Sequence, residues 1–234
     1  MLKIKNVIYT VPPNKKILND VNLTIKNKEQ ISIVGQNGAG KSTLLKLITN
    51  LIEPTYGEVE RNYNTNDVSF VLQDVQSSTF KNLTLKQNML LAYYKRSTSL
   101  LSYPQVDCEY WLKKLNLGLE EKVNQPLSSL SGGQRQALSI IMAIMTYPKL
   151  LILDEHTSAL DPITAKNLMD LTFKLCKEYQ ITTVMVTHNL DHAVKYSDRV
   201  LVLKNGSIKH DLTNVQNVQD LMSLLLPETK DTLI

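Results

Sequence analysis

The sequence lacks an apolar run that could cross a lipid bilayer, because a membrane-spanning helix needs about 18 to 20 consecutive apolar residues. Its first residues, 1–6, also lack the apolar core of a secretion signal. The two cysteines, Cys108 and Cys176, show no Cys-x-x-Cys spacing, so we expect buried or idle thiols in a reducing cytosol. We therefore expect a cytoplasmic chain that reaches a membrane only through a partner.

The sequence also lacks internal repeats, low-complexity tracts and a strong net charge. Its 234 residues have the composition of an ordinary globular protein and suffice for a sizeable core. A net charge of +4 is compatible with a surface that binds a membrane face or nucleic acid, but it favours an ordinary solvated surface.

Glycine is absent from residues 74–117, where helical patterns at 83–94 and 110–117 flank a predicted loop at 97–104. Elsewhere apolar strands alternate with helices, which predicts an α/β fold with a largely parallel sheet. Hairpins at the start of the chain and around Asn205-Gly206 predict antiparallel strands at the margin of that sheet. We expect a single domain made of an α/β core (1–73 and 147–212), an inserted helical subdomain (74–146) and a C-terminal tail (213–234).

The same patterns predict the individual elements. Strands are expected to begin at Leu2 and to cover 21–25, 31–34, 68–72, 150–153, 182–186, 199–203 and 207–209. Further helices are expected at 44–51, 130–145, 161–175, 190–196 and 218–226. Turns or breaks are expected at 12–14, 27–28 and 54–57.

A glycine-rich loop lies between the apolar strand 31–34 and a helix. The spacing of Gly35, Gly40 and Lys41 is typical of a phosphate-binding loop, whose backbone N–H groups point at phosphate oxygens beside a helix N-terminus. We expect Lys41 to reach the β- and γ-phosphates of a nucleotide and the Ser42 hydroxyl to bind Mg²⁺. The loop consists of Gly35, Gln36, Asn37, Gly38, Ala39, Gly40, Lys41, Ser42 and Thr43.

Four polar groups follow predicted strands, at the sheet edge where α/β folds bind their ligands. Asp154 can hold Mg²⁺, and Glu155 can accept a proton from water that attacks the γ-phosphate. His188 follows the next strand and can donate to that phosphate or orient the water. The amide oxygen of Gln73 is a further candidate ligand of Mg²⁺.

A second anion site is predicted where the helix 130–145 begins, because a hydroxyl and free backbone N–H groups meet there. It consists of Ser131, Gly132, Gly133 and Gln134. One nucleotide loop and a second phosphate site, far apart in sequence, suggest that the second site completes the nucleotide pocket of another copy of the chain.

These motifs, in this order, resemble those of the nucleotide-binding subunit of ABC transporters, over nearly the whole chain. The sequence Leu-Ser-Gly-Gly-Gln at 130–134 matches that family's signature letter for letter. The remaining matches are the phosphate loop 35–43, the glutamine loop at Gln73, the acidic strand 150–155 with its catalytic Glu155, the aspartate loop 158–161 with Asp161, and the switch histidine His188.

The resemblance implies an ABC-type P-loop ATPase that binds ATP and Mg²⁺. Two cassettes would close head to tail on two ATP molecules, each held between one phosphate loop and the partner's signature. Closure would drive integral membrane permease subunits, which the helical insert and Gln73 would contact. The resemblance further implies an extracytoplasmic solute-binding protein, a place on the cytoplasmic face of a bacterial membrane and no nucleic acid partner.

Two departures from the family pattern stand out. The family usually has proline after the catalytic Glu155, and this chain has His156. The stretches 116–120, 134–139 and 154–162 resemble a branch of bacterial importers that includes transporters assigned to tryptophan or tyrosine. The aromatic residue that stacks on adenine usually stands where this chain has Val11, so either Tyr9 takes the role or adenine has only apolar contacts; we favour Tyr9.

Two other classes compete with a transporter ATPase. A soluble ABC ATPase that acts on DNA or ribosomes resembles this chain less, since such proteins carry long coiled-coil inserts or tandem cassettes. A regulatory module without turnover is disfavoured because Glu155, His188 and Asp161 occur together. The sequence leaves both import and export open. The absence of a fused membrane domain favours import only weakly.

Overall fold

A computed structural model describes residues 1–72, 79–94, 106–155, 157 and 160–225. The chain packs as two compact units. The first comprises Met1–Ile25, Glu29–Arg61 and Met185–Ile234, and the second comprises Lys26–Lys28 and Asn62–Val184. These units group the chain by packing, and the division into core, helical subdomain and tail stays a prediction.

The first unit contains an antiparallel sheet in the order β2-β1-β4. Strand β1 (Leu2–Val11) pairs with β2 (Lys15–Ile25) on one side and with β4 (Tyr56–Arg61) on the other. The expected antiparallel strands at the start of the chain therefore form a separate sheet and not a margin of the parallel one. Strand β4 was not expected, because its polar sequence carries no apolar run and its pairing with β1 decides its conformation.

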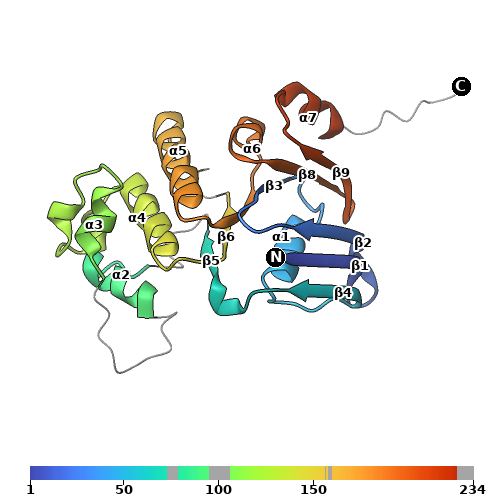
Figure 1. Ribbon diagram of the computed structural model, residues 1–234, viewed down its shortest axis with the longest axis horizontal. Helices are drawn as coiled ribbons and strands as arrows, with labels where there is room; N and C mark the ends of the chain where they lie inside the picture. The colour runs from blue at the N-terminus through green and yellow to red at the C-terminus, as the bar shows by residue number, and fades with distance from the viewer. Residues whose placement is uncertain (73–78, 95–105, 156, 158–159, 226–234) are drawn as a thin grey trace, which may run out of the picture. The chain divides into compact units, whose positions relative to one another are not determined.

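The parallel pairing expected around the glycine-rich loop is present in the same unit. The buried strand β3 (Gln30–Val34) pairs parallel with β8 (Arg199–Lys204), and β8 pairs antiparallel with β9 (Ser207–Thr213). The helices of this unit are α1 (Lys41–Ile48), α6 (Leu190–Tyr196) and α7 (Val218–Leu225). Helix α6 packs on both β3 and α7, as Figure 1 shows.

In the second unit, β5 (Val68–Val71) pairs parallel with β6 (Leu150–Asp154), and β7 (Thr182–Val186) follows in the sheet order. The boundary between the two units falls within β7. The α-helices of this unit are α2 (Leu85–Tyr94), α3 (Cys108–Lys113), α4 (Gly132–Ile144) and α5 (Pro162–Glu178). Short 3₁₀ turns cover Thr65–Asp67, Glu120–Lys122 and Leu127–Ser129.

Helix α3 ends earlier than its apolar pattern predicts. Asn116 and Gly118 have φ angles of 52° and 65°, which a right-handed helix cannot contain. The expected helix 110–117 therefore stops at Lys113, and the next residues form a turn. The loop expected at 97–104 lies outside the described residues.

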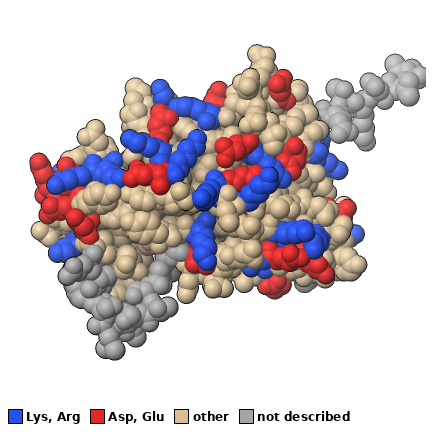
Figure 2. Space-filling view, in the orientation of Figure 1, with Lys and Arg blue, Asp and Glu red and all other residues tan. Residues whose placement is uncertain are grey.

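The structure can be compared with the sequence in two further respects, the membrane-spanning helices and the surface charge. Among the described residues, no helix combines the length and apolar character that crossing a membrane requires. Figure 2 shows basic and acidic side chains next to each other on the visible face, as the small net charge suggests.

Candidate functional site

The glycine-rich loop connects β3 to α1 through a backbone that needs glycine. Gly40 precedes α1 with a φ of 104°, in the left-handed region that other residues rarely adopt. A Cβ atom at Gly40 would lie 3.0 Å from the carbonyl oxygen of Ile17 and 3.1 Å from Cδ2 of Leu18. The loop therefore lies close to β2, and no larger residue fits at this position.

The tip of the β8–β9 hairpin supports the same loop. The N–H of Gly206 donates to the carbonyl oxygen of Ala39 at 2.9 Å, and the carbonyl of Gly206 accepts from the N–H of Asn19 at 2.9 Å. Gly206 has a φ of 77°, and a Cβ atom there would overlap the carbonyl oxygen of Ile17. The Asn-Gly pair predicts the turn but not this contact, which is long-range in sequence.

The side chain of Lys41 turns back toward the first residues of the phosphate loop. Its side chain is buried, and Nζ donates to the carbonyl oxygens of Gly35 at 2.7 Å and of Gln36 at 3.1 Å. Ser42, in the first turn of α1, is exposed, and that turn contains no acidic residue. The helix start therefore presents an ammonium group, a hydroxyl and free N–H groups together, a set that suits phosphate.

His188 and Tyr9 also belong to the first unit. His188 is exposed and directly precedes the capping residue Asn189, whose side chain accepts from the N–H of His192 at 3.0 Å. Tyr9 is half-buried and pairs with Leu18, the residue whose side chain approaches Gly40. Val11, half-buried as well, pairs with Lys15, so the choice of Tyr9 for adenine stays a prediction.

The acidic pair lies in the second unit. Asp154 is the last residue of β6, and Glu155 follows it with a φ of 45°. Both are half-buried, and the left-handed turn at Glu155 redirects the chain directly after the strand. Gln73 and His156 lie outside the described residues, and so do Ser158 and Ala159 of the aspartate loop.

The predicted second anion site begins α4 with a capping box. The Oγ atom of Ser131 accepts from the N–H of Gln134 at 3.3 Å, and Oε1 of Gln134 accepts from the N–H of Ser131 at 3.1 Å. A serine hydroxyl that accepts one hydrogen bond keeps its own proton to donate. The pattern Ser-x-x-Gln signals this box in the sequence, although we did not predict it.

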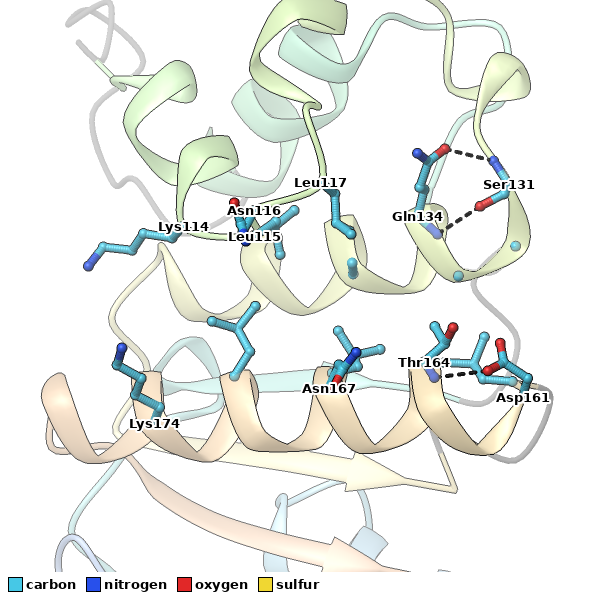
Figure 3. A pocket seen from close by; sticks show the side chains of 16 residues that line it. Lys114, Leu115, Asn116, Leu117, Ser131, Gln134, Asp161, Thr164, Asn167 and Lys174 are labelled. Atoms are coloured by element: carbon cyan, nitrogen blue, oxygen red, sulfur yellow. Dashed lines mark hydrogen bonds between the residues drawn. The ribbon is translucent and has the colours of Figure 1, made fainter.

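A groove of about 860 Å³ runs between α4 and α5. Figure 3 shows Ser131 and Asp161 at one end of it and Lys114 and Lys174 at the other. Asp161 caps α5 by accepting from the N–H of Thr164 at 3.0 Å, and hydrogen bonds from the Thr164 side chain and backbone lower its pKa. The structure therefore brings the signature and Asp161, distant in sequence, to one groove.

Glycine sets the spacing at this end of the groove. A Cβ atom at Gly133 would lie 3.1 Å from Cγ2 of Thr164, whereas one at Gly132 would meet nothing within 4 Å. Gly133 therefore lets the first turn of α4 approach α5, and Gly132 is exposed. An exposed helix start of this kind can accept an anion from outside the chain.

Comparisons with known proteins agree with these motifs. A family profile described as "ABC transporter" matches residues 18–158. A tyrosine transport ATP-binding protein of Clostridioides difficile is 38% identical over 231 residues, covering 91% of this chain and 92% of that protein. A choline transport ATP-binding protein of Bacillus subtilis is 35% identical, covering 89% of this chain and 56% of that protein.

A solved structure agrees as well. It is a dimeric post-hydrolysis state of an ATP-binding cassette with ADP and phosphate bound, and it matches with a TM-score of 0.75 and 30% identity. The match covers 93% of this chain and all of that one.

Proposed function

The chain belongs to the ABC transporter ATP-binding family, and from that premise we propose that it powers the import of an amino acid through separate membrane permease subunits. Members of this family bind and hydrolyse ATP, and this chain is an ATPase of that type. The observation that carries the solute class is the similarity to a tyrosine transport protein over almost the full length of both chains. Import, the partnership with permease subunits and the amino acid are the proposed parts.

The residues take the following roles in the proposal. The N–H groups of the phosphate loop and Lys41 hold the β- and γ-phosphates. Glu155 accepts a proton from the attacking water, and His188 orients that water or donates to the γ-phosphate. Tyr9 stacks on adenine. Asp161 contacts the second copy of the chain.

Two of the three proposed Mg²⁺ ligands are described by the structure, and both carry oxygen donors. The Ser42 hydroxyl is exposed at the start of α1, and the Asp154 carboxylate ends β6, so both are hard ligands of the kind that Mg²⁺ prefers. Gln73 is the third proposed ligand. Bound Mg²⁺ would neutralise charge that develops on the β- and γ-phosphate oxygens.

The proposal includes a homodimer with two shared sites. The motif of Ser131, Gly132, Gly133 and Gln134 would bind the γ-phosphate held by the phosphate loop of the other copy. Three observations support this arrangement: the exposed start of α4, the place of Asp161 beside it, and the dimeric state of the related cassette. A separate solute-binding protein and a place at the cytoplasmic face of a bacterial membrane complete the proposed system.

The test is solute uptake by cells of the source organism that carry Glu155→Gln at the chromosomal locus. We expect uptake of labelled tyrosine or tryptophan to be lost and uptake of choline and phosphonate to be unchanged. The matched control is Glu121→Gln, which makes the same carboxylate-to-amide change at an exposed position of the second unit. Loss of choline uptake alone would replace the amino acid by a quaternary amine, and unchanged uptake of every solute would refute the import proposal.

A further inference from the structure

Helix α7 is attached to the first unit by one face. Leu221 is fully buried in a cluster with Val34, Ala193, Val200 and Val202, and Leu225 packs against that cluster. Met222, one residue further along the helix, is 59% exposed. A single apolar stripe therefore fixes α7 in place, and the cluster into which it packs includes Val34, the residue that directly precedes the phosphate loop.

A polar contact joins the end of α7 to the loop itself. The side-chain amide of Gln36 donates from Nε2 to the carbonyl oxygen of Leu225, the last residue of α7, at 3.2 Å. The final carbonyls of a helix have no donors within the helix, so a side chain that reaches them acts as a cap. Gln36, in the phosphate loop, caps the C-terminal helix.

The apolar packing of α7 and its hydrogen bond from Gln36 both connect this helix to the residues expected to bind phosphate. The backbone carbonyl of Gln36 accepts from Nζ of Lys41 at 3.1 Å, so one residue contacts Lys41 through its backbone and α7 through its side chain. Helix α6, which begins two residues after His188, packs on α7 as well. A shift of α7 would therefore act on the start of the phosphate loop and on the segment that follows His188.

We propose that α7 holds the phosphate loop in its ATP-binding shape and that Gln36 is a positioning residue that acts through α7. The inference follows from contacts within the first unit and does not depend on the transported solute. Because the contacts precede any chemical step, their loss should weaken ATP binding and leave turnover at saturation nearly unchanged. By linkage, ATP should in turn stabilise the attachment of α7.

The experiment combines one substitution with two chain lengths. Gln36→Leu removes the donor at an exposed position, and a chain that ends at Leu224 removes the acceptor carbonyl of Leu225. The matched control is a chain that ends at Pro227, which keeps that carbonyl. We expect Gln36→Leu to raise KM for ATP about two- to tenfold, the range for one neutral hydrogen bond, with kcat within about twofold. The chain that ends at Leu224 also loses the packing of the Leu225 side chain and should raise KM at least as much.

The double variant decides whether Gln36 acts through α7. In the chain that ends at Leu224, Gln36→Leu should cause no further rise in KM, because the partner is already gone. An equal additional rise would mean that Gln36 contacts the nucleotide directly and would overturn the proposal. So would an unchanged KM in the Gln36→Leu full-length chain, or a control chain ending at Pro227 that binds ATP as weakly as the chain ending at Leu224.

Hydrogen exchange on the intact chain tests the reciprocal effect without any variant. Addition of ATP should slow exchange of the backbone amides of α7, including those near Leu221 and Leu225. The amides of β4, which pairs with β1 in the same unit, serve as the internal reference. Slowed exchange in the phosphate loop with no change in α7 would contradict the coupling.

Discussion

The phosphate loop and the signature motif both place glycine at the start of a helix, yet different contacts fix the two motifs in the structure. The phosphate loop is fixed by long-range contacts, because Ala39 is bonded to Gly206 and Gly40 lies against β2. The signature is fixed by a local capping box between Ser131 and Gln134. The first site is therefore shaped by its own unit, whereas the second is an exposed helix start, which in the proposed dimer would face the nucleotide held by the partner.

The largest expected effect comes from a substitution that stops ATP hydrolysis and leaves both the phosphate loop and the signature motif unchanged. Glu155→Gln should reduce the rate of ATP hydrolysis by about 10²- to 10⁴-fold, the contribution of a general base. ATP binding to the phosphate loop should persist, as measured by equilibrium titration with labelled ATP. Hydrolysis within a fewfold of the unmodified protein would remove Glu155 from that role and leave the source of the base open.

The long-range support of the phosphate loop can be broken at Gly206. Gly206→Ala combines a left-handed φ of 77° with overlap between the new Cβ atom and the carbonyl of Ile17. We expect it to lower the free energy of unfolding by about 3 kcal/mol, measured by urea denaturation. Gly118→Ala, with a φ of 65° but no atom within 4 Å, should cost about 1 to 2 kcal/mol. Equal losses would show that the hairpin contact contributes nothing.

The signature can be broken without touching the phosphate loop. In a Glu155→Gln background, Ser131→Arg should weaken ATP-dependent dimer formation by about 10- to 100-fold, since a bulky side chain overfills the surface expected to receive the partner's γ-phosphate. ATP binding to each monomer should be unchanged. Light scattering with and without ATP measures the dimer, and Ser128→Arg, at an exposed serine nearby, is the control. Normal dimerisation of the Ser131→Arg protein would contradict the shared site.

The smallest expected effect concerns the base of the nucleotide. Tyr9→Ala should weaken ATP binding about two- to tenfold, the amount that one aromatic contact contributes. Tyr9→Phe keeps the ring and should bind normally. If Val11→Ala weakens binding instead, the adenine contact lies at Val11 and is apolar.

Local sequence patterns predicted much of this architecture. The strands β3, β6 and β7 are short, largely apolar and almost entirely buried, and α5 begins where Asp161 and Pro162 signal a cap and a first turn. Strand β4 was missed because its sequence, Tyr-Gly-Glu-Val-Glu-Arg, becomes a strand only through its pairing with β1.

The candidate site follows the same rule. The phosphate loop, the signature and the aspartate cap carry local motifs, so their residues could be identified from the sequence. The supports of the phosphate loop could not, because the contact of Gly206 with Ala39 and that of Gln36 with Leu225 join segments more than 150 residues apart. Turn and helix signals predict each partner separately but contain no information about their pairing.

The placement of Lys41 has a consequence for how ATP affinity should be interpreted. Its ammonium group is buried and bonded to two backbone carbonyls of its own loop. If a nucleotide binds this ammonium group, the two hydrogen bonds to the carbonyls must be exchanged for bonds to phosphate oxygens. The measured affinity for ATP is then the difference between the free energies of these two sets of bonds. We therefore expect the measured affinity for phosphate to understate the strength of the new ion pairs, because two hydrogen bonds of Lys41 are lost as they form.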